Sequence, residues 1–171
     1  MQLFRLIIPF LVATLGSAKT VYLIRHGEKP ADGGNGLTIQ GMQRAQCLRG
    51  VFGASSQYNI GYIIAQQPKA SGKRTRPLMT VQPIANDLGL TVDTSCDRDD
   101  ADCVASLVDN YSGTGNILLC WEHDNLSLIA EAMGDKSPPT YPDDSFNLIW
   151  TDPSPYTDIT AITSENCPGL D

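Results

Sequence analysis

The sequence predicts an α/β fold, a three-layer α/β/α sandwich built around a mostly parallel sheet. Short apolar runs rich in β-branched residues alternate along the chain with longer segments of helical periodicity, a pattern typical of this class. Each of the two histidines, His26 and His123, lies at the end of such an apolar run. In an open α/β sheet, ligands bind outside the carboxyl ends of the strands. The sequence therefore indicates a site where these runs end.

The first apolar run, residues 20–24, is expected to be a buried strand. A polar, glycine-rich loop at 29–36 leads from it into a helix at 37–49. Thr38 is a candidate N-cap, because its hydroxyl can accept a hydrogen bond from the first turn. The inner face of this helix is expected to carry Leu37, Gly41, Ala45 and Leu48.

A second strand and helix are expected at 60–65 and at about 76–88, with Gly89 as the C-cap signal. The loop between them is basic and contains Lys69, Lys73, Arg74 and Arg76. In a chain with 12 Lys and Arg against 19 Asp and Glu, this cluster is either a solvated loop or an anion site.

The second half of the chain continues the alternation with shorter elements. We expect strands at 90–92, 117–121, 146–150 and 159–162, helices at 102–110 and 126–133, and a proline-rich loop at 137–142. If the strands before His26, the basic loop and His123 are parallel, their carboxyl ends lie together. These three segments are then parts of one site.

Residues 1–18 have the layout of a secretory signal peptide. Arg5 precedes an apolar stretch at 6–15, and small residues follow at 16–18. The apolar stretch is too short to span a bilayer. We therefore expect residues 19–171 to form one secreted domain that does not bind a membrane after the leader is removed. A net charge of −7 also disfavours nucleic acid as a partner.

Export makes disulfides permissible, and the five cysteines leave one thiol unpaired within a monomer. Cys96 and Cys103, on either side of a short acidic loop, are the preferred pair. Cys120 lies within an apolar run and is expected to be a buried free thiol, and the second pairing would join Cys47 to Cys167. Sequons occur at Asn110 and Asn125, and a glycan at Asn125 would crowd the site near His123.

The residues around His26 suit phosphoryl transfer. Gly27 lets the backbone turn sharply and lets a ligand approach closely. Arg25 can grip an anion with its guanidinium, as Arg76 can from the basic loop and His123 from the other strand end. With these cations around the phosphate, His26 can attack in line and form a phosphohistidine that water hydrolyses.

Four segments resemble the histidine phosphatase superfamily, also called the phosphoglycerate mutase-like family. Segment 25–28 (RHGE) resembles its Arg-His-Gly signature, and 37–45 (LTIQGMQRA) resembles its Leu-Thr-x-x-Gly helix. Segment 76–81 (RPLMTV) resembles its Arg-Ala-x-x-Thr-Ala helix start, and His123 matches its second histidine. The four occur in the family's order, and the chain looks like a small secreted member of the type found in fungi.

The resemblance implies a phosphoglycerate mutase-like fold, His26 as the phosphorylated nucleophile, and Arg25, Arg76 and His123 as the phosphate pocket. It implies no metal and no cofactor, because the arginines neutralise the phosphate charge. The expected ligand is a small phosphorylated substrate or inorganic phosphate. The proton donor is open among three candidates. Asp124, directly after the second histidine as in the acid-phosphatase branch, comes first, followed by Glu28 and then by the loop 97–100.

The leading hypothesis is therefore a secreted, metal-independent phosphomonoesterase that works through a phosphohistidine on His26. One alternative is a binding module of the same fold that kept the pocket but lost turnover. A phosphoglycerate mutase-type phosphotransferase is a third hypothesis, which we rank lower because the short chain leaves little room for loops that enclose an intermediate.

Overall fold

Strands and helices alternate along residues 18–171, the part of the chain that the computed structural model describes. The strands are β1 (Thr20–Arg25), β2 (Ile60–Ala65), β3 (Val92–Asp93), β4 (Asn116–Trp121), β5 (Leu148–Pro153) and β6 (Ala161–Ser164). The helices are α1 (Ile39–Val51), α2 (Arg76–Leu88), α3 (Ala101–Asn110) and α4 (His123–Met133). The predicted leader, apart from Ala18, lies outside the described residues. No helix in the described part of the chain is both long and apolar enough to cross a bilayer.

The strands form one six-stranded sheet in the order β3-β2-β4-β1-β5-β6. The pairs β1–β4, β2–β4 and β2–β3 are parallel, whereas β5 runs antiparallel to both β1 and β6. The prediction of a mostly parallel sheet is thus confirmed. The parallel half brings the carboxyl ends of β1, β2 and β4 to one edge.

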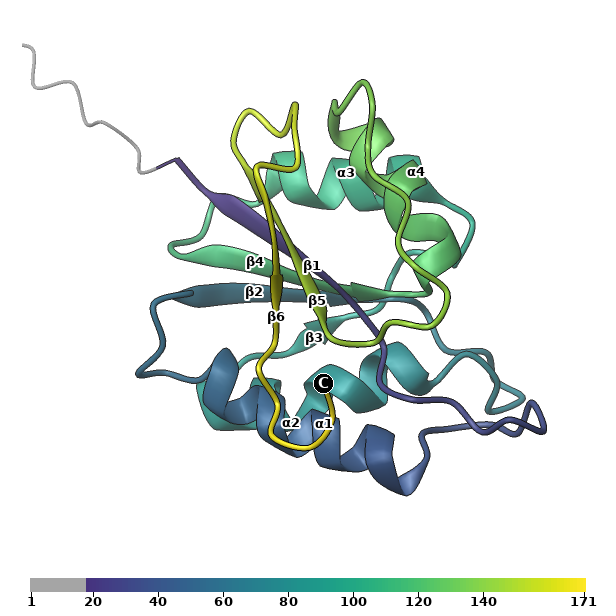
Figure 1. Ribbon diagram of the computed structural model, residues 1–171. Helices are drawn as coiled ribbons and strands as arrows, with labels where there is room; N and C mark the ends of the chain where they lie inside the picture. Colours follow the sequence, from purple (N-terminus) through teal and green to yellow (C-terminus); the bar gives the residue numbers. More distant parts are fainter. Residues whose placement is uncertain (1–17) are drawn as a thin grey trace, which may run out of the picture.

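Helices cover both faces of the sheet, so the three-layer prediction is also confirmed (Figure 1). On one face, α3 and α4 pack through Val104, Val108, Leu126 and Ile129. On the other face, α1 and α2 pack through Leu48, Phe52, Val81, Ile84 and Ala85. The sheet is buried on both sides, which explains why its inner strands read as continuous apolar runs.

The local signals for helix ends are mostly correct. The Thr38 hydroxyl accepts a hydrogen bond from the backbone N–H of Gly41, and Gly89 ends α2 in the left-handed conformation. The main difference lies at α4, which begins at His123 rather than at the predicted residue 126. The acidic first turn and the burial of Asn125 extend this helix back to the end of β4.

Gly41 lets α1 contact the turn that follows β1. A Cβ atom at Gly41 would lie 2.7 Å from the backbone oxygen and 2.8 Å from the backbone nitrogen of Glu28. We expect Gly41→Ala to lower the melting temperature, because overpacking costs about 1–3 kcal/mol and exceeds the gain of up to about 1 kcal/mol in helix propensity. Gly50→Ala in the same helix, where a Cβ meets nothing within 4 Å, is expected to raise it. Thermal unfolding of both variants checks the two signs.

Two disulfides join the cysteines as predicted, Cys96 to Cys103 and Cys47 to Cys167. Cys120 is free, fully buried in β4, and its burial raises the pKa of the thiol well above the ordinary value. The Cys47–Cys167 bond fastens the C-terminal tail to α1, across a separation of 120 residues.

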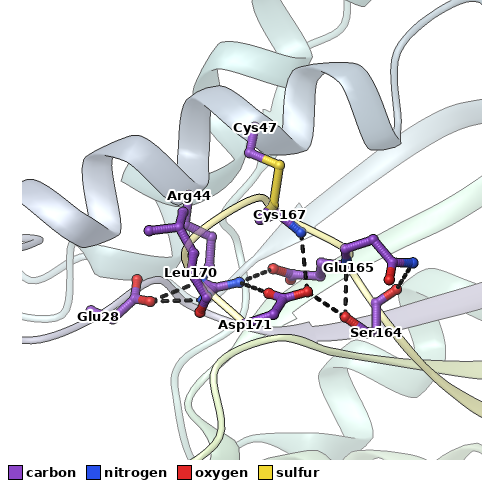
Figure 2. The surroundings of a disulfide bond; sticks show 9 residues. Glu28, Arg44, Cys47, Ser164, Glu165, Cys167, Leu170 and Asp171 are labelled. Carbon is purple, nitrogen blue, oxygen red and sulfur yellow. Dashed lines mark hydrogen bonds and ion pairs between the residues drawn. A yellow bond between two sulfur atoms is a disulfide. The ribbon is translucent and has the colours of Figure 1, made fainter.

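A buried ion cluster accompanies this second disulfide (Figure 2). The guanidinium of Arg44, 1% exposed, donates to Oε1 of Glu28 at 2.8 Å and to Oε2 of Glu165 at 2.7 Å. It also donates to Oδ1 of Asp171 at 3.3 Å and to the carbonyl oxygen of Leu170 at 2.6 Å. One side chain of α1 thus ties the residues after His26 to the end of the chain.

Two buried carboxyls make stability depend on pH. Asp152 is 0% exposed, neither of its oxygens has a hydrogen-bond partner among the described residues, and burial raises its pKa from 3.8 to about 7. Burial likewise raises the pKa of Glu165 to about 8. Because the folded state binds these protons more tightly than the unfolded chain, their stabilising effect is complete below the unfolded pKa values. It is lost as the pH rises through 7 and 8.

We therefore expect the free energy of unfolding to fall between pH 5 and pH 8, by up to about 1.4 kcal/mol per pH unit for each group. Urea denaturation at pH 5, 6, 7 and 8 measures this slope. Asp152→Asn should reduce the slope, and Asp158→Asn, at an exposed position, should leave most of it intact. An Asp152→Asn protein with the wild-type slope would contradict the assignment.

Candidate active site

Three side chains project from the same sheet edge because three parallel strands end there. His26 directly follows β1, Gln66 follows β2, and Glu122 follows β4. The backbone N–H of His26 donates to the carbonyl of Trp121 at 3.2 Å, and that of Gln66 donates to the carbonyl of Cys120 at 3.3 Å. The sheet register therefore continues one residue past the strands and aligns the three side chains.

The imidazole of His26 is fixed by its own backbone turn. Its Nδ1 lies 2.7 Å from the carbonyl oxygen of Gly27, which can only accept, so Nδ1 carries a proton. The backbone N–H of Gly27 donates to the hydroxyl of Thr80 in α2 at 2.9 Å. The turn is thus held from both sides, and Nε2 is the ring atom left to face the site.

Glu122 lies between the two histidines and contacts both of them. Its Oε2 is 3.2 Å from Nε2 of His26, and its Oε1 is 2.9 Å from Nδ1 of His123. Burial acts to raise the pKa of this carboxyl, but the hydrogen bonds and charges of the two histidines outweigh it and lower the pKa below the usual range. Sequence reasoning did not select Glu122; its position directly after a buried strand was the available signal.

A cavity of about 270 Å³ opens over His26. Its lining is formed by His26, Gly33, Asn35, Gln66, Lys73, Arg74, Arg76, Pro77, Arg98 and Glu122. The set is rich in cations, and it joins the end of β1 to the basic loop, as the sequence predicted. Gln66, 2% exposed with an unpartnered Oε1 among the described residues, adds a polar group that the sequence analysis missed.

No family model matches the chain, and no curated protein matches it in sequence. Solved structures do match. The protein histidine phosphatase SixA complexed with tungstate has a TM-score of 0.59 and 13% identity, over 85% of this chain and 97% of that one. A protein described as phosphohistidine phosphatase SixA from Agrobacterium tumefaciens has a TM-score of 0.55 and 16% identity, over 85% and 98%. A protein described as an alpha-ribazole-5'-P phosphatase from Escherichia coli has a TM-score of 0.51 and 18% identity, over 68% of this chain and 79% of that one.

The fold is that of the phosphoglycerate mutase-like histidine phosphatases. The order of elements agrees with the sequence motifs that predicted it. Segment 25–28 leaves β1, segment 37–45 enters α1, segment 76–81 begins α2, and His123 begins α4.

In this histidine phosphatase fold, Arg76 lines the cavity and also holds the glycine-rich loop after β1. Its Nε donates to the carbonyl of Gly36 at 3.0 Å and its Nη2 to the carbonyl of Gly34 at 2.8 Å. The carbonyl of Arg76 in turn accepts from the Thr80 hydroxyl at 2.8 Å. Arg76 thus couples the start of α2 to the loop that covers the cavity.

Arg25, predicted as a phosphate ligand, is not among the cavity-lining residues. Its buried Nη1 donates to the carbonyl oxygens of Asp143 at 2.7 Å and Ser145 at 2.6 Å, and its guanidinium stacks on the ring of Phe146 at 3.8 Å. Burial lowers the pKa of this guanidinium. In this geometry Arg25 positions the loop before β5, and that loop places Phe146 beside the His26 ring at a centroid distance of 6.2 Å.

His123 and Asp124 lie behind Glu122 and are not among the cavity-lining residues. Nε2 of His123 is 3.2 Å from Oδ1 of Asp143 and 3.4 Å from Oδ1 of Asp124. The side chain of Asp124 is 62% exposed. The structure therefore brings together His26 and Arg76 from the predicted set and joins His123 to them through Glu122.

The other two predicted acids also lie away from His26 Nε2. Glu28 turns toward α1 and pairs with Arg44, in the buried cluster of Figure 2. In the loop 97–100, Asp97 pairs with Arg74 at 2.9 Å, and Asp100 caps α3. This loop contributes a cation to the cavity, Arg98, rather than an acid.

Glu122, His123 and Asp124 also offer ligand atoms within 4.8 Å of one another, a set that fits a divalent cation. The prediction of metal-free chemistry therefore needs a chelator in the assay that tests it.

Proposed function

We propose that this protein is a phosphomonoesterase that works through a phosphohistidine on His26. The observation that carries the proposal is the orientation of the His26 ring. Its Nδ1 is bound to the Gly27 carbonyl at 2.7 Å, which directs Nε2 toward a cation-lined cavity and toward the carboxylate of Glu122. A histidine held in this way needs no metal to act as a nucleophile, because the cations neutralise the phosphate charge.

The first step transfers the phosphoryl group and one proton. In the free site Nδ1 of His26 faces the Gly27 carbonyl, and Nε2 lies 3.2 Å from Oε2 of Glu122, so one proton can be shared between Nε2 and that carboxylate. A phosphate that enters beside Glu122 favours transfer of the Nε2 proton to that carboxylate. The freed lone pair then attacks phosphorus, the bond from phosphorus to the leaving oxygen breaks, and that oxygen takes the proton from Glu122.

The second step returns the site to its starting state. Water gives a proton to the Glu122 carboxylate, its oxygen attacks phosphorus, and the bond from phosphorus to Nε2 of His26 breaks. Inorganic phosphate leaves, and the proton on Glu122 returns to Nε2. The same carboxyl thus acts as acid in one step and as base in the other.

We further propose that the enzyme is exported. Residues 1–18 read as a leader, and the two disulfides are of the kind that persists in oxidising compartments. A secreted enzyme with a cavity of this size fits the predicted ligand, a small phosphorylated substrate.

The test is turnover of para-nitrophenyl phosphate in the presence of EDTA, followed by trapping of the intermediate. Phosphate bound to histidine is labile in acid and stable in base. We expect EDTA-resistant turnover and, after an alkaline quench, an acid-labile phosphate on the peptide that contains His26. Turnover that EDTA abolishes, or turnover without a phosphorylated peptide, would overturn the proposed route.

The proton-transfer role predicts a distinct effect for Glu122→Gln. Glutamine keeps the size of the side chain but cannot exchange a proton, so kcat/KM for an alkyl phosphate, which reports the steps up to departure of the leaving group, should fall by about 10²- to 10⁴-fold. The loss should be smaller for para-nitrophenyl phosphate, whose leaving group needs no proton. Steady-state kinetics on both esters measures the difference in kcat/KM, with Glu131→Gln, exposed on α4, as the control. Equal losses on the two esters would refute this role.

A binding module is the alternative, and the lowered pKa of Glu122 favours it, because an ionised carboxylate has no proton to give to a leaving group. Tungstate binding by calorimetry, together with no turnover of any ester, would support this alternative over the enzyme.

A further inference from the structure

The cavity over His26 is lined by more cationic side chains than one phosphate monoester requires. Four of its lining residues are cations, Lys73, Arg74, Arg76 and Arg98, whereas Glu122 is its one acid. A monoester phosphate carries at most two negative charges, and Arg76 already lies beside the loop that covers His26. The remaining three cations come from the basic loop and from the loop before α3, so they form a second wall.

Arg98 in this wall is held in place from several sides. Its carbonyl oxygen accepts from the indole Nε1 of Trp121 at 2.9 Å. Its guanidinium Nε donates to Oδ1 of the buried Asn125 at 3.2 Å and lies 3.1 Å from Oδ1 of Asp99. The Cys96–Cys103 disulfide closes the loop around it. Within the described residues, the two terminal guanidinium nitrogens of Arg98 have no hydrogen-bond partner, so they are available to an anion.

Arg74 lies on the same wall, and its backbone has a positive φ. Its φ of 61° lies in the left-handed region, which residues other than glycine seldom occupy. Its Nη1 pairs with Asp97 at 2.9 Å and so links the two loops. Asp99 also lies 3.7 Å from Nη2 of Arg74. The side chains of Asp97 and Asp99 are 53% and 61% exposed, so solvent weakens their opposition to a bound anion.

The size of the cavity limits the ligand to a small molecule. A water molecule occupies about 30 Å³ in the liquid, so about 270 Å³ corresponds to roughly nine waters. That volume is larger than one phosphate group, with its five heavy atoms, would fill. It lies near the lower end of the volumes of small-molecule binding sites. There is room for a second phosphate on a short carbon chain.

Accordingly, we infer that the substrate is a small organic bisphosphate, with its second phosphate bound by Arg98, Lys73 and Arg74. The inference rests on the proposed function and adds the substrate class to it. An Arg fork binds a phosphate through two parallel hydrogen bonds, and such charged hydrogen bonds correspond to an affinity gain of about 10- to 100-fold.

Three esters with the same three-carbon chain test this inference: propyl phosphate, 3-phosphooxypropanoate and 1,3-propanediol bisphosphate. We expect kcat/KM to be about 10- to 100-fold higher for the bisphosphate than for propyl phosphate, chiefly through KM. Comparing kcat/KM of the carboxylate ester with that of the bisphosphate shows whether a second anion of any kind gives the same increase. Arg98→Gln should bring the ratio of bisphosphate to propyl phosphate close to one. Arg49→Gln, which removes an equal charge from the exposed end of α1, should leave the ratio unchanged.

The outcomes separate this inference from the proposed function. Turnover of propyl phosphate at least as efficient as that of the bisphosphate overturns the inference and leaves the phosphatase in place. If no ester is turned over, the proposed function fails, and calorimetry decides the inference on its own. Tighter binding of the bisphosphate than of propyl phosphate, lost in Arg98→Gln, supports the second phosphate site, and equal binding overturns it.

Discussion

Replacing His26 with asparagine is expected to reduce phosphate release by at least about 10⁴-fold, because a covalent route disappears with its nucleophile. Asparagine can keep a side-chain hydrogen bond to the carbonyl of Gly27, which Nδ1 of His26 makes at 2.7 Å. The turn after β1 should therefore survive in the variant. Turnover of para-nitrophenyl phosphate in EDTA measures the loss, and the alkaline-quench assay should show no acid-labile phosphate on the protein.

The control for this experiment is a check that His26→Asn is folded. Circular dichroism and the urea midpoint of His26→Asn should match those of the wild type. If the variant stays folded and still forms an acid-labile phosphoenzyme, the phosphate resides on another group, and the assignment of His26 is wrong. His123 is then the residue to examine, since it is the other histidine and contacts the same carboxylate.

Replacing Arg44 with methionine is expected to lower the free energy of unfolding by about 3–5 kcal/mol, the usual cost of removing one partner from a buried ion pair. Methionine fills much of the space but leaves the carboxylates of Glu28 and Asp171 without their shared cation, and the Glu165 carboxyl without its hydrogen-bond donor. Urea denaturation at pH 7, with the disulfides intact, measures the change. Activity should also fall, because Glu28 is two residues from His26.

Arg49→Met is the matched control, since it removes an arginine of the same helix whose pair with Asp87 is exposed to solvent. It should change the urea midpoint little. A second test adds Glu28→Gln and Glu165→Gln to Arg44→Met. If uncompensated charge causes the loss, the triple variant should be more stable than Arg44→Met alone. An Arg44→Met protein as stable as the wild type would show that the cluster of Figure 2 contributes little to folding.

The sequence by itself determined the fold class, because that class is encoded in short-range patterns. Apolar runs alternate with segments of helical period, and Thr38 and Gly89 mark helix ends. The apolar, β-branched run before His26 predicts a strand. It also predicted the short-range Cys96–Cys103 disulfide and the buried Cys120 thiol. These features follow from local composition and spacing, which a single chain displays directly.

The sequence also placed His26 and Arg76 at one site, since parallel strands end at a common edge. It did not find Gln66, Glu122 or Arg98. Glutamine and glutamate after a strand have no distinctive spacing, and Arg98 lies in an acidic loop that suggests no anion site. Their role is visible only when the register of β2 and β4 aligns them with His26.

Tertiary structure alone decided where the long charged side chains go. Arg25 sits next to His26 in the chain, yet its guanidinium binds the carbonyls of the loop before β5. Glu28 pairs with Arg44, and Asp124 points to solvent from the first turn of α4. The secondary structure, which the sequence pattern predicts, fixes the position of the Cα atom from which such a side chain extends. Which partner it reaches depends on groups brought close by folding, because hydrogen bonds and ion pairs act over only a few ångströms.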